Sequence, residues 1–371
     1  MKLFYFSVTK HQYKYFNKLK DNLPFDSIHK FFPNLSVSID GFLYFKNIDV
    51  KDIYELKFKE IDKKYKSVIK KTLYKSFLKL QAPWVVSVTY KTIKSYNPDF
   101  VVLWNGKKFH QAIVEKVSKS LDKRCIYFEN GVLPDTTTID FVGVNATASI
   151  SREYSFYKNL NFTDKETLSK NIISRVSKNK AKNSVVKLPD NYIFVPFQVG
   201  YDSQIMSHSP WIEDMYEFFE IVEYLSKKID LKFVIKEHPS DRVNDYSSLY
   251  KRVNDNIFFT SQNTQMLIEK SSAVLTINSS VAIESLLFHK KVIVLGEAFF
   301  TIDGIVKIAN NKNEILNILK DIDNFEPDIK TIDNFLKYLK YNYLVPKSWR
   351  EPNKEHFDII ESKIKDRISN G

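Results

Sequence analysis

The sequence predicts an α/β protein built from two lobes, and three observations lead to this prediction. Short runs of β-branched and aromatic residues alternate along the chain with segments of helical periodicity. Strands that alternate with helices form parallel sheets whose two faces are covered by the helices. A chain of 371 residues is long enough for two domains, each with its own hydrophobic core, since typical domains hold about 100–200 residues. An apolar fraction of 43% and an aromatic fraction of 15% fit a folded chain.

Eight segments have the composition of strands. They are residues 2–8, 100–104, 124–129, 192–199, 232–236, 256–260, 273–277 and 291–295. Helical periodicity is clearest in residues 211–227, 261–270 and 281–288, and it returns in the tail at 349–368. The first strand also explains the N-terminal apolar run, which is too short for the apolar core of a signal peptide.

The polar segment 163–187, rich in lysine, serine and asparagine, is the expected junction between the lobes. We therefore expect an N-terminal lobe at 1–187, with a basic helical insertion at about 51–80, and a C-terminal lobe at 188–346. Residues 347–371 are expected to form a helix that packs back on the N-terminal lobe. Ligands of such sheets lie beyond the carboxyl ends of the strands, so a central cleft is the expected site.

The chain is basic, with a formal net charge of +12. Residues 51–80 hold ten lysines and four acids, so this segment alone carries 10 − 4 = +6. Its apolar side chains recur every three or four residues, at Tyr54, Phe58, Ile61, Tyr65 and Val68. Either this stripe lies on the core of the lobe, or the segment contacts anionic membrane lipid or an acidic glycan. Nucleic acid is not an expected partner, because no nucleic-acid-binding motif accompanies the charge.

Several common chemistries lack their motifs in this sequence. A single cysteine, Cys125, forms no intrachain disulfide and fits a reducing cytoplasm. The histidines have no metal-ligand spacing, so neither a metal nor a cofactor is expected. The glycine-rich phosphate loops and the serine-hydrolase elbow are absent. No run approaches the roughly 18–20 apolar residues of a membrane-spanning helix, and we expect a cytoplasmic protein, either soluble or peripheral on the membrane.

Polar residues follow two strands of the C-terminal lobe. The strand at 273–277 leads into Asn278, Ser279 and Ser280, where a helix begins, and free N–H groups at a helix start bind phosphate. Glu284 lies one turn into that helix, within reach of a ribose. The alternative is an ordinary helix cap with an exposed glutamate.

The second strand, at 232–236, ends in Lys236-Glu237-His238-Pro239. Proline stops the pairing and keeps His238 out of a helix, so the imidazole stays at the carboxyl end of the strand. There it can donate a hydrogen bond to a phosphate, or it can simply cap a loop.

Two strands of the N-terminal lobe end in a similar way. One delivers Glu129 to its carboxyl end, followed by Asn130 and a glycine, and the other delivers Asn105. A glutamate at such a strand end is a candidate general acid or base. Asn-Gly pairs are also ordinary turn residues. Taken alone, Asp202 in the loop after residues 192–199 has the composition of a turn or helix cap as well.

Together, four motifs resemble the bacterial capsule polysaccharide biosynthesis and export family, over roughly residues 101–296. They are FENGVLPDTTTIDFVGVN, PFQVGYDSQI, KEHPSDR and NSSVAIESLLFHKKVIVLG, in this order. More narrowly, they resemble its retaining β-Kdo glycosyltransferases, which use CMP-Kdo as the donor. The resemblance implies a GT-B-like pair of Rossmann-type lobes, with CMP-Kdo on the C-terminal lobe and the acceptor glycan on the N-terminal lobe.

The resemblance also implies roles for individual residues. Asp202 would be the nucleophile of a double displacement, and Glu129 the acid/base that serves the acceptor. As groups that bind CMP, the resemblance implies His238, Ser279, Ser280 and Glu284. Lys236 and Asn278 are further candidates for donor binding, and Gln198 and Gln204 are candidates for orienting the carboxylate or the sugar. Asn105 and Asn130 are candidates on the acceptor side.

The expected partners are CMP-Kdo, an oligosaccharide or lipid-linked acceptor, and an anionic membrane surface at the inner face of the cytoplasmic membrane. No metal is required if the serines, the helix start and His238 neutralise the single phosphate. Two alternatives stay open. One is a GT-B transferase that uses CMP-sialic acid or a UDP- or GDP-sugar, and the other is a non-catalytic component of capsule assembly or export that binds glycan.

Overall fold

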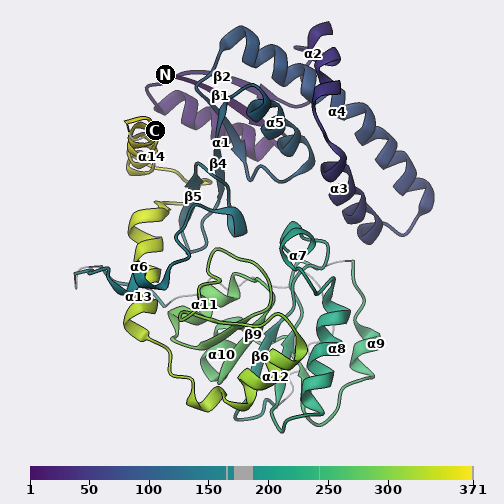
Figure 1. Cartoon of the computed structure of the whole chain (residues 1–371), viewed down its shortest axis with the longest axis vertical. Helices are drawn as coiled ribbons and strands as arrows, with labels where there is room; N and C mark the ends of the chain where they lie inside the picture. The colour runs from purple at the N-terminus through teal and green to yellow at the C-terminus, as the bar shows by residue number, and fades with distance from the viewer. Residues whose placement is uncertain (164–165, 171–186, 242, 370–371) are drawn as a thin grey trace. The chain divides into compact units, whose positions relative to one another are not determined.

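A computed structural model describes residues 1–163, 166–170, 187–241 and 243–369 (Figure 1). The chain forms two compact units, unit 1 from residues 1–149 and 343–371 and unit 2 from residues 150–342. The division lies earlier than the expected boundary at 187, because α6 (Tyr154–Lys158) packs on α13 (Ile329–Tyr338) within unit 2. The amide of Asn334 donates to the carbonyl of Tyr157 at 2.9 Å. Most of the expected junction at 163–187 lies outside the described residues.

Unit 1 contains a six-stranded sheet in the order β12-β5-β4-β3-β1-β2. Its strands are β1 (Lys2–Ser7), β2 (Asp26–Phe31), β3 (Phe100–Trp104), β4 (Arg124–Asn130), β5 (Thr136–Asp140) and β12 (Val345–Pro346). Strands β1 to β4 are parallel, whereas β5 runs antiparallel to β4 and β12 antiparallel to β5. The sheet is mainly parallel, as expected, and the antiparallel strands are confined to this edge. A tight turn, in which Gly131 N donates to Thr136 O at 3.0 Å, sends the chain straight back as a hairpin.

Alternation along β1 directs its side chains to two cores. Phe4 and Phe6 lie in a core beneath α3 (Lys51–Lys64), α4 (Val68–Tyr96) and α5 (Phe109–Ser120). Leu3 and Tyr5 lie in a core beneath α1 (Lys10–Asn22) and α14 (Lys354–Ser369). Both faces of the sheet are thereby covered, as expected. Helix α1 begins with a capping box formed by Thr9 and Gln12. The Thr9 side chain accepts from the backbone N–H of Gln12, and the Gln12 side chain accepts from the backbone N–H of Thr9.

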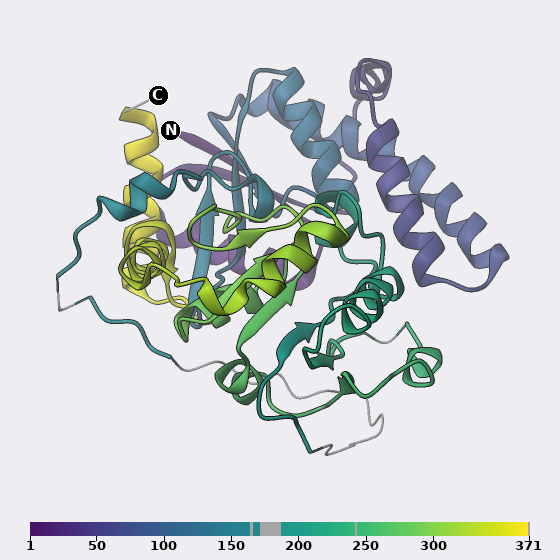
Figure 2. The same ribbon diagram turned by 60° about the horizontal axis from the view of Figure 1, so that its bottom comes forward.

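The lysine-rich segment forms two helices, α3 (Lys51–Lys64) and α4 (Val68–Tyr96), which lie side by side in both ribbon views (Figures 1 and 2). A short helix, α2 (Ile39–Tyr44), packs on α4. Tyr54, Phe58 and Tyr65 pack against the core, which agrees with the predicted stripe. Val68 departs from that prediction, because it begins α4 and its side chain is 74% exposed.

Unit 2 contains a second six-stranded sheet, in the order β11-β10-β9-β6-β7-β8, and every pairing in it is parallel. Its strands are β6 (Ile193–Pro196), β7 (Phe233–Lys236), β8 (Ile257–Phe259), β9 (Ala273–Thr276), β10 (Lys291–Val294) and β11 (Lys307–Ile308). The first strand, β6, lies in the middle. The chain proceeds to one side of β6 through β7 and β8, and then to the other side through β9, β10 and β11. The direction of strand order therefore reverses between β6 and β9, as in doubly wound nucleotide-binding domains.

Helices cover both faces of the unit 2 sheet, as Figure 2 shows. Residues of α8 (Met215–Ser226) and α12 (Lys312–Lys320) pack with Val195 and Ile235, and residues of α10 (Thr264–Lys270) and α11 (Val281–Leu287) pack with Phe194 and Val234. Two further short helices are α7 (Ser203–His208) and α9 (Ser247–Tyr250). Within the described ranges, no helix has both the length and the apolar character needed to cross a bilayer.

Candidate functional site

Two loops meet where the strand order of unit 2 reverses. Gln198 follows β6 and Asn278 follows β9, and the side chains of both are buried. The amide of Gln198 donates to Asn278 Oδ1 at 2.9 Å, and the backbone N–H of Asn278 donates to Gln198 Oε1 at 3.1 Å. This pair lies where the strand order reverses, the place at which sheets of this topology bind their ligands.

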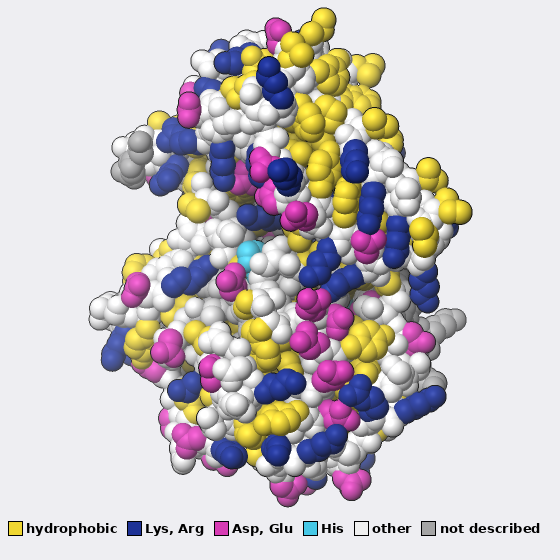
Figure 3. All heavy atoms as spheres, turned by 45° about the vertical axis from the view of Figure 1, so that its right-hand side comes forward, with side chains coloured by type: hydrophobic (Ala, Val, Ile, Leu, Met, Phe, Trp, Pro, Cys, Tyr) yellow, Lys and Arg dark blue, Asp and Glu magenta, His cyan; other side chains and the backbone are white. Residues whose placement is uncertain are grey.

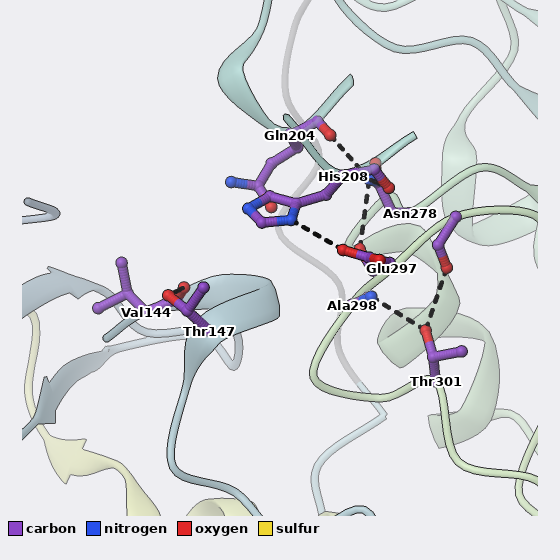
Figure 4. A network of polar contacts seen from close by, with 9 residues as sticks. Val144, Thr147, Gln204, His208, Asn278, Glu297, Ala298 and Thr301 are labelled. Atoms are coloured by element: carbon purple, nitrogen blue, oxygen red, sulfur yellow. Dashed lines mark hydrogen bonds and ion pairs between the residues drawn. The ribbon is translucent and has the colours of Figure 1, made fainter. Parts of the chain in front are cut away.

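The amide of Asn278 also holds helix α7 (Figure 4). Its Nδ2 donates to the carbonyls of Gln204 at 3.0 Å and His208 at 3.1 Å. The imidazole of His208 then pairs with the Glu297 carboxylate at 3.2 Å, beyond the end of β10. One buried side chain therefore fixes the position of α7 against the loop after β9.

Asp202 is the N-cap of α7. Its Oδ1 accepts from the backbone N–H of Gln204 at 2.9 Å and from the Ser203 hydroxyl at 3.4 Å, and the residue is exposed. The predicted capping role is thus present in the structure. The same bonds fix the carboxylate at the surface of the loop that follows β6, on a helix that Asn278 holds in place.

The serine pair begins α11, after β9. Ser279 Oγ accepts from the backbone N–H of Val281 at 3.2 Å, so Ser279 provides the local cap. Ser280 is exposed at the N-cap position and makes no capping bond through its side chain. Its hydroxyl and the N–H groups of the first turn lie at the same carboxyl edge of the sheet.

Lys236 and His238 stand at the end of β7, on the opposite side of β6 from β9. Burial lowers the pKa of Lys236, and the nearby Glu284 carboxylate offsets only part of this effect. These two predicted residues therefore interact electrostatically. Lys236 Nζ also donates to the Thr264 hydroxyl at 2.7 Å. His238 Nδ1 accepts from Ser240 N at 3.1 Å, which places the imidazole hydrogen on Nε2, as donation to a phosphate requires.

Sequence reasoning missed Asp241, which organises the loop of His238. Its carboxylate is buried and accepts from the Asn244 amide at 2.7 Å and from the Tyr246 hydroxyl at 2.8 Å, while its backbone N–H donates to His238 O at 3.0 Å. Glu237 was also missed: burial raises the pKa of its carboxyl group, which the Tyr250 hydroxyl bonds. The turn composition Pro-Ser-Asp was the available signal.

Unit 1 brings together the three polar residues predicted there. Glu129 Oε2 accepts from the Asn105 amide at 2.6 Å, and Oε1 accepts from the backbone and the side-chain amide of Asn130, each at 2.8 Å. Asn105 has a φ of 68°, in the left-handed region that asparagine tolerates. Both oxygens of Glu129 are therefore held in place, as a group that transfers protons requires.

Trp349 joins this cluster from the far end of the chain. Its indole N–H donates to Asn130 Oδ1 at 2.8 Å, and its ring lies 4.8 Å from that of Trp104, centroid to centroid. No local sequence signal could reveal this contact, because Trp349 lies 219 positions after Asn130 in the chain. Among the residues that the structure describes, no three His, Cys, Asp or Glu side chains are arranged to hold a metal ion.

Comparison with known proteins identifies the family. The model of the family described as "Capsule polysaccharide biosynthesis protein" matches residues 129–342, more than half of the chain. The chain belongs to the capsule polysaccharide biosynthesis family. The predicted family is thereby confirmed, and the match begins at Glu129 and includes every candidate residue of unit 2.

Two curated relatives of this capsule biosynthesis chain extend the comparison. Protein FixF of Sinorhizobium fredii is 34% identical over 283 residues, which cover 75% of this chain and 69% of the relative. The capsule polysaccharide export protein KpsS of Escherichia coli is 30% identical over 164 residues, 41% of this chain and 40% of KpsS.

A solved structure shares the fold of the capsule biosynthesis chain. The "KpsC, beta Kdo 2,7 transferase" of Thermosulfurimonas dismutans superposes with a TM-score of 0.52 at 11% identity, covering 98% of this chain and 100% of that chain. The predicted fold class, α/β and GT-B-like with Rossmann-type units, is confirmed. The predicted roles of individual residues stay predictions.

Proposed function

We propose that this capsule biosynthesis protein is a retaining β-Kdo transferase, which moves Kdo from CMP-Kdo to a bacterial surface glycan. One observation carries the proposal. Three neighbouring strands of unit 2, β9, β6 and β7, lead at the reversal of strand order into loops that carry the serine pair, Asp202 and His238 respectively. Nucleotides bind at this place in doubly wound sheets. The β-Kdo 2,7-transferase KpsC of Thermosulfurimonas dismutans has the same fold, which supports Kdo as the transferred sugar.

In this proposal unit 2 holds the donor. The phosphate of CMP accepts hydrogen bonds from His238 Nε2, from the Ser280 hydroxyl and from N–H groups at the start of α11. Lys236 contributes positive charge, and Glu284 accepts from the ribose hydroxyls. A donor with a single phosphate carries little charge, so these groups neutralise it without a metal ion or cofactor.

The proposed chemistry is a double displacement. A carboxylate oxygen of Asp202 attacks the anomeric carbon, the bond from that carbon to the phosphate oxygen breaks, and CMP leaves with the bonding electrons. An acceptor hydroxyl then attacks the same carbon and displaces Asp202, while Glu129 takes the proton of that hydroxyl. Two inversions at one carbon leave its configuration unchanged. Asn105 and Asn130 orient Glu129, and Gln204 orients the sugar or the carboxylate.

The acceptor in this proposal is an oligosaccharide or a lipid-linked glycan, and the enzyme works at the inner face of the cytoplasmic membrane. The basic α3–α4 segment supports this location. Neither the acceptor sugar nor the location is needed for the donor chemistry.

Incubation with CMP-Kdo and Kdo-terminated or lipid-linked acceptors tests the function. We expect release of CMP, and NMR of the product should give the β configuration at the new linkage. In parallel, CMP should raise the melting temperature, since a ligand at 100 times its Kd stabilises by about 2.7 kcal/mol. Stabilisation by UDP or GDP but not CMP would assign another donor. Binding of CMP-Kdo without turnover on any acceptor would indicate a non-catalytic glycan-binding protein.

A further inference from the structure

Exposed apolar side chains concentrate in one region of unit 1. Figure 3 shows hydrophobic side chains gathered along one edge of the visible face. Of the 17 large apolar residues that are exposed in the described part of the chain, nine fall between residues 35 and 80. They are Leu35, Ile39, Phe42, Leu43, Val68, Ile69, Leu73, Phe77 and Leu80. Exposed apolar residues that are scattered singly over a surface are ordinary, whereas a concentration of them indicates an interaction site.

One side of α4 carries the largest part of this patch. Ile69, Leu73, Phe77 and Leu80 recur at intervals of four, four and three, which places them on one side of the helix. Their exposed fractions lie between 54% and 73%.

The opposite side of α4 is occupied by α3. Tyr74 packs on Tyr65 with ring centroids 5.9 Å apart, Lys75 pairs with Asp62 at 2.7 Å, and Leu78 is buried. The helix therefore has two apolar sides, of which one faces the core of unit 1 and the other faces outward.

Helix α2 extends the outward side. The backbone N–H of Ser38 donates to Ser87 Oγ at 2.9 Å, and the Trp84 indole donates to Asn34 O at 2.6 Å, so α2 is fixed to α4 just beyond Leu80. Ile39 and Leu43, one turn apart on α2, are 79% and 60% exposed. We name the exposed apolar side chains of residues 35–43, in the α2 region, and of residues 68–80, in α4, the α2–α4 apolar surface.

Lysines surround this surface. The segment 51–80 carries ten lysines against four acids. Three of these acids already pair with lysines, Asp52 with Lys116, Glu60 with Lys57, and Asp62 with Lys75. Lys66, Lys70 and Lys79 are exposed beside the apolar side chains of α4. The excess charge around the surface is therefore positive.

We propose that the α2–α4 apolar surface docks on the headgroup region of an anionic lipid bilayer. Apolar side chains at helical spacing, bordered by lysines, are what a helix lying in the plane of a membrane surface requires. Lysines near such a surface are attracted to anionic headgroups. Lysine is depleted in interfaces between proteins, so the composition favours lipid over a protein partner. The surface involves none of the proposed catalytic residues, so vesicle binding tests it independently of turnover.

Flotation with vesicles provides the first test. We expect the full chain to float with vesicles of phosphatidylcholine and phosphatidylglycerol, to bind pure phosphatidylcholine at least about tenfold more weakly, and to dissociate partly in 1 M salt. The double variant Leu73→Ser/Phe77→Ser should bind anionic vesicles roughly tenfold more weakly. The matched control is Val253→Ser/Tyr341→Ser, which changes two apolar residues of unit 2 that are each 42% exposed and should leave binding unchanged. Circular dichroism checks that each variant is folded.

A fluorescent label provides the second test, which does not depend on removing side chains. Ser76 is exposed and shares the outward side of α4 with Ile69 and Leu80. The variant Ser76→Cys can be labelled selectively, because Cys125 is buried and burial raises the pKa of its thiol to about 12. An environment-sensitive dye at residue 76 should shift to the blue on anionic vesicles, and the same dye at Ser248→Cys on α9 should not.

Three results would overturn the proposal. The first is no binding to anionic vesicles by the full chain. The second is a dye at residue 76 that does not respond while the protein floats, since the protein then docks elsewhere. The third is a dimer, formed without lipid and abolished by Leu73→Ser, which would assign the surface to a second copy of the chain.

Discussion

The side-chain amide of Gln198 donates to Asn278 Oδ1 at 2.9 Å and accepts from the Asn278 backbone N–H at 3.1 Å. This pair joins the loops that follow β6 and β9, two adjacent parallel strands. The strand order of the sheet reverses between them. Because Asn278 also bonds Gln204 O and His208 O, the pair connects the serine turn to the helix that Asp202 begins. The relative position of the proposed nucleophile and the proposed phosphate site therefore depends on two buried amides.

Asn278→Ala should destabilise unit 2 and weaken CMP binding. The substitution removes the acceptor of the Gln198 amide and the side-chain donor to the carbonyls of Gln204, His208 and Glu297. An unsatisfied buried group costs about 1–3 kcal/mol. Urea denaturation of Gln198→Ala, Asn278→Ala and the double variant should give a coupling free energy of roughly 0.5–3 kcal/mol. The exposed Asn161→Ala is the control and should change stability little. Additive losses in the double variant would contradict the coupling.

Asp202→Asn separates a capping role from a nucleophilic role. Asparagine caps a helix about as well as aspartate, so stability should change by less than about 0.5 kcal/mol. An amide is a poor nucleophile, so CMP release with acceptor present should fall by about 10³-fold or more. Asp202→Ala should lose both activity and roughly 1 kcal/mol of stability. Full activity in Asp202→Asn would leave Asp202 with the capping role that the structure shows.

Glu129→Gln should slow the second displacement and spare the first. The amide is of equal size and keeps one oxygen for Asn105 or Asn130, but it takes no proton from the acceptor, so turnover should fall by about 10²–10⁴-fold. Rapid-quench measurement should still detect about one equivalent of CMP per enzyme, and mass spectrometry should detect Kdo attached to the Asp202 peptide. Glu355→Gln, an exposed change on α14, is the control. A missing burst of CMP would contradict the assignment of Glu129 to the second step.

The strands that the sequence predicted are those with local apolar runs. All eight predicted segments contain strands, and the ends differ by a few residues at most, at β6. Among the described residues, the four strands that were not predicted lack such a run. In β2, the residues DSIHKF are only partly buried at the sheet edge, and pairing with β1 decides their conformation. Strands β11 and β12 have two residues each, too few for any periodicity.

The candidate site divides in the same way. Glu129, His238 and Ser279 were predictable because a strand that ends in polar residues is visible locally. Trp349 was not predictable, because it meets Asn130 only when the distant C-terminal segment returns to unit 1. Asp241 was not predictable either, because its bond with Tyr246 depends on the conformation of the folded loop. Asp140 is a third example. It lies within a recognised motif, yet two of its partners, Ser149 and Tyr343, lie at the two points where the chain crosses between units.

Asp140→Asn should therefore cost unit 1 about 2–4 kcal/mol. The carboxylate is buried, its Oδ1 accepts from the backbone N–H groups of Val142 and Gly143, and its Oδ2 accepts from Ser149 and from the Tyr343 hydroxyl at 2.8 Å. An amide would direct N–H groups at some of these donors. Tyr343→Phe removes one donor alone and should cost about 1 kcal/mol in urea denaturation. Equal, small effects of both substitutions would contradict this role for the carboxylate.

Unit 1 should lose stability in mild acid because it buries neutral histidines. Burial, assisted by the charges of Lys20 and Lys57 respectively, lowers the pKa values of His29 and His110 to about 4. Burial also lowers the pKa of His356. Unfolded histidine titrates near pH 6.5, so between about pH 6.5 and 4 the unfolded chain binds more protons than the folded chain. The free energy of unfolding is therefore highest above pH 6.5 and should decrease as the pH falls towards 4.

The change His110→Gln measures one part of this dependence. His110 Nε2 bonds Gln81 Oε1 at 2.8 Å, and the amide of glutamine offers a donor in its place without a titrating group. Urea denaturation between pH 7.5 and 4.5 should show a shallower loss of stability in this variant, by at most about 1.4 kcal/mol per pH unit. The exposed His11→Gln is the matched control and should keep the slope of the unchanged protein. An equal slope in all three proteins would show that His110 takes up its proton without unfolding, because its surroundings open to water first.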